Sequence, residues 1–194
     1  MITYFLFLSM LVPFIYILYF IKTIETYNDE TFTYTISKYK VGKDFPIDVC
    51  FQWDDHIFYR DVFKDAVAYI NSRLGLSVVN NNILKTPTDK SVLINFYRGK
   101  HLPTHPPFDG EGRVLAHAES PPGNRICFDA DERWTREKLF ITFIHEFFHT
   151  LGFKHTKRKT SLMYHLYKVN VDILDNTDVT NFFQLFPFLI MRAK

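Results

Sequence analysis

The run from His145 to His155, His-Glu-Phe-Phe-His-Thr-Leu-Gly-Phe-Lys-His, constrains the fold of this chain more than any other. On a helix, His145 and His149 lie one turn apart on the same face, close enough for two imidazole nitrogens to bind one metal ion. Gly152 can take the left-handed conformation that ends a helix, so the chain can turn back and offer His155 as a third ligand. Three protein nitrogens leave a fourth position open for water, which is typical of a catalytic zinc rather than a structural one.

A second run lies just beyond the first. Residues 161–167 are Ser-Leu-Met-Tyr-His-Leu-Tyr, and Met163 follows His155 by eight residues. This is the tight turn, with a methionine beneath the metal, that the longer zincin motif requires. A helix that merely contains two histidines would explain the first histidine pair, but not the glycine, the third histidine and the methionine turn together.

The two runs together resemble the matrixins, the matrix metalloproteinase branch of the metzincins, whose matching turn typically reads Ala-Leu-Met-Tyr-Pro-x-Tyr. The resemblance extends from residue 32 to about residue 186. It implies an α+β, zincin-like fold: a twisted, mostly parallel five-stranded sheet with three helices and a catalytic zinc in a cleft. It also implies a zinc-dependent endopeptidase that hydrolyses peptide bonds of extracellular proteins.

Glu146 follows the first ligand directly and is the residue expected to move protons. Zinc would polarise the scissile carbonyl and lower the pKa of its bound water, and Glu146 would accept a proton from that water as general base. The alternative is a catalytically inactive module of the same fold that binds zinc and calcium. The presence of Glu146 argues against that alternative.

Resemblance to the matrixins also implies a calcium site in the segment before the zinc helix. Its ligands would be the carboxylates of Asp109, Asp129 and Glu132 and backbone carbonyl groups near Gly110, Gly112 and Val114. An all-oxygen shell of this kind suits a hard cation such as Ca²⁺. An acidic loop without an ion is the competing interpretation.

A second zinc site is implied, although the chain departs from the family pattern there. His101 and His117 match structural zinc ligands, but Pro103 and Cys127 stand where the family has an aspartate and a histidine. A thiolate is a good zinc ligand. A closed tetrahedral set would comprise four side chains: His101, His105, His117 and Cys127. The alternative is a disulfide between Cys50 and Cys127, with the zinc site lost.

The same resemblance implies where a substrate lies. An extended polypeptide would pair backbone to backbone with an edge strand over residues 113–118. The pocket just past the metal would set specificity. Because His165 replaces the usual proline there, the preferred P1′ residue can differ from that of the family, and we expect a bulky apolar one. The expected substrate-binding residues are Leu115, Ala116, Ile141, His165 and Tyr167.

Residues 1–21 contain no charged side chain and are long enough to cross a bilayer. We expect an uncleaved signal anchor over 1–22, with a cleaved signal peptide as the alternative, then a spacer over 23–31 and the catalytic domain over 32–194. Both interpretations send the chain into the secretory pathway, membrane-anchored or secreted, with the catalytic domain luminal or extracellular. Neither a cysteine-switch propeptide nor a haemopexin domain is recognised, so we expect a short form of the family.

Composition limits the remaining options. The chain has 194 residues, 47% of them hydrophobic, which is enough for one domain and its core. Its net charge is +2, from 23 basic and 21 acidic residues, so there is no electrostatic case for nucleic-acid binding. We expect a monomer whose partners are an extended polypeptide substrate and, through the N-terminal segment, a membrane.

The apolar pattern predicts secondary structure on either side of the zinc helix. The expected elements are helices over 61–73 and 175–186, strands over 32–39, 76–79 and 92–97, and loops over 80–82 and 86–89. Thr135 is a suitable N-cap for the zinc helix. The family usually has glycine where this chain has Phe148, so a large ring must be packed beside the ligands.

Overall fold

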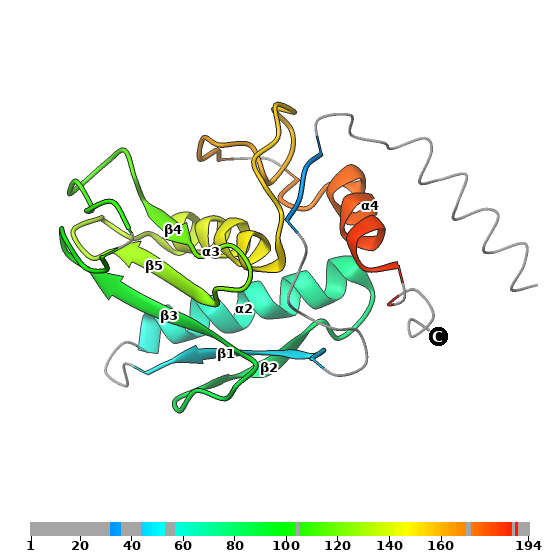
Figure 1. Ribbon diagram of the computed structural model, residues 1–194, viewed down its shortest axis with the longest axis horizontal. Coiled ribbons are helices and arrows are strands. Elements are labelled where there is room, and N and C mark those ends of the chain that lie inside the picture. The colour runs from blue at the N-terminus through cyan, green and yellow to red at the C-terminus, as the bar shows by residue number, and fades with distance from the viewer. Residues whose placement is uncertain are drawn as a thin grey trace, which may run out of the picture.

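The computed structural model of the chain describes residues 32–35, 44–52, 57–103, 105–169, 172–187 and 189. The expected N-terminal anchor over 1–22 and spacer over 23–31 lie outside these ranges. Within them, no helix is both long enough and apolar enough to cross a membrane. The described residues form one sheet with helices packed against it (Figure 1).

The sheet has five strands in the order β2-β1-β3-β5-β4. Their bounds are β1 Ile47–Phe51, β2 Val79–Leu84, β3 Ser91–Tyr97, β4 Ala116–Ala118 and β5 Arg125–Asp129. Neighbouring strands are parallel except for β4, which runs antiparallel to β5 with His117 opposite Cys127. This confirms the predicted α+β fold with a mostly parallel five-stranded sheet, and it places β4 at one edge.

Three helices accompany the sheet in the described residues: α2 Ile57–Leu74, α3 Arg136–Leu151 and α4 Asn176–Leu185. α2 and α3 lie together on one face of the sheet, and α4 lies to the side of them (Figure 1). α4 begins after Asp175, whose side chain accepts a hydrogen bond from the backbone N–H of Asp178, as an N-cap does. The helices predicted over 61–73 and 175–186 are confirmed with shifted ends.

Aromatic rings from both layers meet in the core around Phe63 of α2. Its ring centroid lies 5.3 Å from that of Phe51 on β1, and 5.9 Å from that of Phe128 on β5. The ring of Phe143 on α3 lies 5.1 Å away on the helical side. All four side chains are fully buried, and burial of each contributes about 1.5–3 kcal/mol. These contacts fix α3, and therefore its histidines, relative to the sheet.

The predicted position of the strand around β2 was wrong. β2 spans Val79–Leu84, so the asparagines at 80–82 lie within a strand rather than a loop, and most of 76–79 lies outside it. Asparagine has a low strand propensity, but β2 is an edge strand whose polar groups form hydrogen bonds with neighbouring elements. Asn71 of α2 donates to the Val79 carbonyl oxygen at 2.8 Å and accepts from the Val79 N–H at 3.0 Å.

The first strand of the sheet is β1, which the sequence pattern did not reveal. The strand predicted over 32–39 contains, in its described part, only an isolated bridge between Tyr34 and Phe153. Residues 36–39 lie outside the described ranges. The bridge still matters for the site, because it lies beside the turn at the end of α3.

Candidate active site

Helix α3 supplies the first two histidines. It begins after Thr135, whose Oγ1 accepts a hydrogen bond from the Lys138 backbone N–H at 3.2 Å, so the predicted N-cap is confirmed. One face of the helix is buried in the core. His145 and His149 lie one turn apart and line a cleft on another face.

Gly152 ends α3 and turns the chain toward the third histidine. Its φ is 111°, and its N–H donates to the His149 carbonyl oxygen at 3.0 Å. A Cβ atom at this position would lie 2.4 Å from the Thr35 carbonyl oxygen, which is too close for any side chain. Glycine is therefore required here, and the reversal brings His155 back to the helix.

Three imidazole nitrogens converge beside the C-terminal half of α3. The Nε2 atoms of His145, His149 and His155 lie 3.1–3.2 Å from one another. Nitrogen ligands of a tetrahedral zinc ion, each about 2.0–2.1 Å from the metal, would lie about 3.3 Å apart. The three residues expected from the sequence are thus brought together with a spacing that fits zinc.

Backbone carbonyl groups hold the opposite nitrogens of two of these rings. His145 Nδ1 lies 2.7 Å from the Leu162 carbonyl oxygen, and His149 Nδ1 lies 2.7 Å from that of Phe153. Because a carbonyl only accepts, Nδ1 holds the proton and Nε2 keeps its lone pair for a metal. Burial, with repulsion from neighbouring imidazoles, lowers the pKa of His145 to about 3, that of His149 to about 4, and also that of His155. These shifts favour the neutral form of the rings, which is the form that binds a metal.

Glu146 lies on the wall of the same cleft. The residue is only 6% exposed, and its Oε2 atom is buried without a hydrogen-bond partner. Burial raises the pKa of this carboxyl to about 8. A buried carboxyl oxygen without a partner is costly. This carboxyl is therefore a candidate for a functional role.

Met163 lies in a tight turn after the third ligand. Its side chain is buried, and its carbonyl oxygen accepts a hydrogen bond from the Thr156 N–H at 3.0 Å. The preceding residue, Leu162, provides the carbonyl oxygen that holds His145. The methionine turn predicted from the sequence thus supports the first ligand directly.

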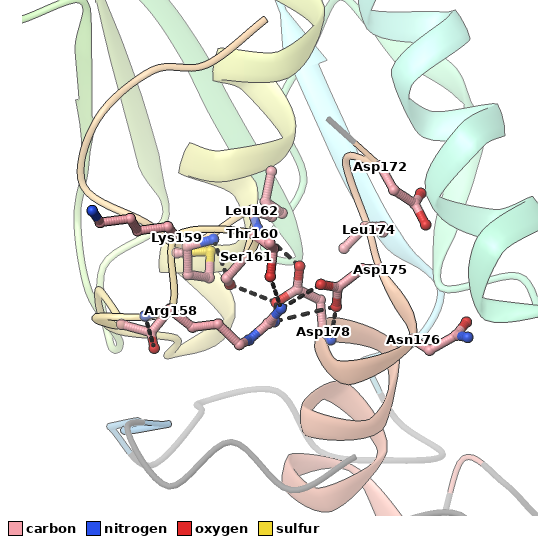
Figure 2. A network of polar contacts seen from close by, with 12 residues as sticks. Arg158, Lys159, Thr160, Ser161, Leu162, Asp172, Leu174, Asp175, Asn176 and Asp178 are labelled. Carbon is pink, nitrogen blue, oxygen red and sulfur yellow. Dashed lines mark hydrogen bonds and ion pairs between the residues drawn. The ribbon is translucent and has the colours of Figure 1, made fainter. Parts of the chain in front are cut away.

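A network of polar contacts fastens this turn to α4 (Figure 2). Asp178 accepts hydrogen bonds from Ser161 Oγ at 2.6 Å and from the Leu162 N–H at 2.8 Å. Arg158 Nη2 donates to Asp178 at 2.7 Å, and Nη1 donates to Asp175, the N-cap of α4. Burial raises the pKa of Asp178 to about 6, although its hydrogen bonds act in the opposite direction. Sequence reasoning missed Arg158 and Asp178, because only the fold brings them together.

The histidines open into a cleft of about 480 Å³ between β4 and the loop that follows α3. All five predicted substrate-binding residues line it: Leu115, Ala116, Ile141, His165 and Tyr167. The β4 wall is shorter than the strand predicted over 113–118, because Arg113 has a φ of 58° and only Ala116–Ala118 forms a strand. On the opposite rim, Leu166 is 58% exposed and leaves apolar surface open to a ligand.

Phe148, which stands where the family usually has glycine, is packed without displacing the ligands. Its side chain is fully buried. The ring centroid lies 5.0 Å from that of Phe153 and 6.1 Å from that of Phe182 on α4. The added ring therefore joins α3 to α4 through aromatic contacts.

A second cluster of candidate ligands lies on the loop before β4 and on β4 and β5. His101 Nε2 and His105 Nδ1 each lie 2.9 Å from His117 Nε2. Cys127 Sγ lies 4.0 Å from His105 Nδ1. All four ligand atoms lie within 4.8 Å of one another, so the structure brings together the predicted set. Three imidazoles and a thiol are suitable donors for a closed structural zinc site.

The disulfide considered as an alternative does not form, because Cys50 and Cys127 are both free and buried. Cys50 lies on β1 and Cys127 on β5, with β3 between them. Strands in a sheet are about 4.8 Å apart, so these residues are about 10 Å apart, beyond the reach of a disulfide. Burial raises the pKa of the Cys127 thiol to about 12. A bound metal ion would be needed to deprotonate it.

The predicted calcium ligands come from the loop before β4, which contains Asp109, and from the end of β5 and the turn after it, which contain Asp129 and Glu132. Backbone N–H groups donate to all three carboxylates: Gly110 to Asp129, Gly112 to Glu132 and Val114 to Asp109. Lys138 Nζ also pairs with Glu132. Burial, and to a smaller extent the neighbouring carboxylates, raises the pKa of Asp129. Among the described residues, only the two histidine clusters have ligand atoms that gather within 4.8 Å, and these carboxylates are not such a group.

Comparison with known proteins agrees with the geometry of the site. A profile of the matrixin family matches residues 26–187. Mouse stromelysin-1 is 41% identical over 92 residues, which are 44% of this chain and 19% of that protein. Xenopus laevis matrix metalloproteinase-18 is 41% identical over 97 residues, 46% of this chain and 19% of that protein. Human matrilysin is 42% identical over 84 residues, 39% of this chain and 31% of that protein.

These matches cover less than a third of the length of each relative. The family profile, by contrast, covers most of this chain, including the sheet, both histidine clusters and the methionine turn. The fold, the zinc-ligand spacing and this match agree, and the chain therefore belongs to the matrixin family.

Proposed function

We propose that this protein is a zinc-dependent endopeptidase. The observation that carries the proposal is the convergence of three Nε2 atoms, from His145, His149 and His155, at 3.1–3.2 Å in an open cleft. Three protein ligands leave a coordination position free, as in catalytic zinc sites, whereas structural sites have four. The buried Glu146 carboxyl on the same wall supports a reaction rather than simple metal storage.

A zinc ion held by the three imidazoles would supply Lewis acidity toward a carbonyl oxygen and would lower the pKa of a water molecule. The chain's own residues would orient the reactants and move the protons. The Leu162 and Phe153 carbonyl groups keep His145 and His149 in the tautomer that leaves Nε2 free. Glu146 would accept a proton from the attacking water and deliver it to the leaving amine.

Hydrolysis of a generic matrixin peptide by the full chain tests this proposal. We expect turnover that is lost when a zinc chelator is added and is restored when zinc is returned. A folded, zinc-loaded chain without turnover would instead support the alternative, an inactive metal-binding module with a metzincin fold. The unpartnered, buried oxygen of Glu146 speaks against that alternative, because such a module would have no use for it.

An extended polypeptide is the proposed substrate. Among the described residues, β4 pairs only with β5, so its outer edge offers backbone groups to a peptide strand. Ile141, His165 and Tyr167 line the cleft beyond the histidines and would surround the P1′ side chain. We expect a preference for bulky apolar P1′ residues in a peptide library. A preference for charged P1′ residues would contradict this assignment of the pocket.

Two further metal sites are proposed to stabilise the domain. The first is a second zinc at His101, His105, His117 and Cys127, supported by their converging ligand atoms. The second is calcium at Asp109, Asp129 and Glu132, supported by the burial of the Asp129 and Glu132 carboxylates and by the backbone N–H groups of one loop that reach all three side chains. Metal analysis should give two zinc ions per chain. Added calcium should raise the unfolding temperature. An unfolding temperature that does not change with calcium would contradict the calcium site.

Extracellular proteins are the proposed targets, reached through the secretory pathway. The uncharged stretch over 1–21 supports entry into that pathway and, if uncleaved, membrane anchoring. Translation with microsomes tests this, because we expect the catalytic domain to be protected from added protease. A domain that is digested while the microsomes are intact would show the opposite orientation.

A further inference from the structure

Positive charge is concentrated in one loop. Residues 153–169, which we call the basic loop, follow α3 and contain five lysines or arginines and no acidic residue. The rest of the chain has 18 basic and 21 acidic residues, a net charge of −3, although the whole chain has +2. The small net charge of the protein therefore conceals a strong local asymmetry.

One of the five bases is turned inward and fixes the loop. Arg158 donates to Asp175 and Asp178 of the α4 region, so its charge is compensated within the protein. Its backbone N–H also donates to Thr156 Oγ1 at 3.2 Å. Thr156 pairs with Tyr164 through a parallel bridge. The loop is therefore anchored at its centre and crossed by backbone pairing, which lowers the entropy cost of binding a ligand.

The other bases remain at the surface. Lys154, Lys157 and Lys159 are exposed, and the Lys159 side chain extends away from the Arg158 network (Figure 2). Lys168, nine residues after Lys159, returns to the same place, because its Nζ donates to the Lys159 carbonyl oxygen. Two segments of the basic loop thus contribute ammonium groups to one surface, and neither segment contains an acidic residue.

This surface lies beside the substrate cleft rather than inside it. Of its four lysines, only Lys168 lines the cleft. At the other end of the basic loop, the Lys154 N–H donates to the Thr33 carbonyl oxygen at 3.0 Å. The next residue, Tyr34, is 51% exposed. The backbone of Tyr34 thus lies beside Phe153 and Lys154. An exposed aromatic ring at this end of the loop can pack on the apolar face of a sugar while lysines pair with anionic groups.

We propose that the basic loop is a docking surface for sulfated polysaccharides. Separate ammonium point charges suit a polymer with repeated sulfate groups, and the adjacent tyrosine suits its sugar rings. The choice of polymer follows from the proposed extracellular location, but binding does not require peptidase activity. A polysaccharide held here would concentrate the protein on a matrix while the cleft stays open to a peptide.

Binding of the full chain to immobilised heparin, in a non-ionic detergent and over a range of salt concentrations, tests the proposal. The test variant is Lys157→Gln/Lys159→Gln. The matched control is Lys64→Gln/Lys85→Gln, which removes the same charge from α2 and from the loop after β2. The test pair should weaken binding and lower the slope of log affinity against log salt by roughly one per lysine. The control pair should leave both nearly unchanged.

Three results would overturn the proposal. The first is that the wild-type chain does not bind heparin at physiological salt. The second is that the test and control substitutions weaken binding equally, which would indicate an effect of net charge rather than a site. The third is that polyglutamate displaces the chain from immobilised heparin as well as free heparin does at equal charge, which would indicate an acidic protein segment as the ligand. Lys154→Gln, at the far end of the loop, provides an independent variant and should also weaken binding. Because no turnover is measured, an inactive chain would give the same result.

Discussion

The two histidine clusters use the same kind of ligand but differ in the number of ligands and in how the chain holds them. At α3, three imidazoles face an open cleft, and two of them come from a single helix. At β4 and β5, three imidazoles and a thiol come from a loop and two paired strands. Three ligands leave a position for chemistry, and four close the site. We infer that one domain separates a metal for reaction from a metal for stability.

The largest effect is expected from removing one ligand of the open cluster. His149→Ala should reduce peptide hydrolysis to the background rate, because two imidazoles do not hold a catalytic zinc in place. Zinc should fall from two ions to one per chain, since the second cluster is intact. Peptide turnover and metal analysis measure the two effects. His165→Ala, which removes a histidine of the cleft outside the triad, is the control and should keep both zinc ions.

Removing a ligand of the closed cluster should lower stability and leave turnover nearly unchanged. Cys127→Ser should lower the free energy of unfolding by roughly 3 kcal/mol, the stabilisation by a metal present at a few hundred times its Kd. For a domain of this size, the unfolding temperature should fall by about 6–12 °C. Turnover per folded molecule should change little. Loss of turnover without loss of stability would reverse the roles we assign to the two clusters.

The polar network that supports the open cluster should have a pH dependence that arises from Asp178. The pKa of Asp178 is raised from 3.8 to about 6, so the folded state binds this proton more tightly than the unfolded state does. This contribution to stability is present at low pH and is lost as the pH rises through about 6; it amounts to at most about 3 kcal/mol.

Asp178→Asn removes the titrating group. The stability of the wild-type chain relative to this variant should therefore fall between about pH 4 and about pH 7. Denaturant unfolding of both proteins at several pH values measures the difference. A difference that does not vary with pH would show that the carboxyl titrates normally, and that the Arg158 contact outweighs its burial.

The smallest effect concerns the start of the helix that bears the open cluster. Thr135→Ala removes the N-cap hydrogen bond to the Lys138 N–H and should cost about 1 kcal/mol of unfolding free energy. Both zinc ions should remain bound, because His145 lies well inside the helix. Thermal unfolding with metal analysis tests this. Selective loss of the catalytic zinc would show that the open cluster depends on the whole helix rather than on its last turns.

The sequence alone was sufficient where the site depends on local geometry. His145, His149 and His155 could be predicted as ligands because helical periodicity and one glycine turn determine where they lie. Whether Cys127 forms a disulfide with Cys50 could not be predicted, because it depends on β3 lying between β5 and β1, and strand order is not a local property. For the same reason, the Arg158 contacts across to α4 were missed. β2 was misplaced because tertiary contacts rather than strand propensity stabilise it: Asn81 accepts a hydrogen bond from Asn71 of α2, and Asn80 donates one to Asp48 of β1.

The central claim is that Glu146 acts on a substrate held beside the metal of the open cluster. The most direct measurement compares Glu146→Gln with Glu137→Gln, the same change at an exposed position in the first turn of α3. We predict that Glu146→Gln keeps its zinc but loses roughly 10²–10⁴-fold in turnover, while Glu137→Gln retains both. Full turnover by zinc-loaded Glu146→Gln would contradict the account.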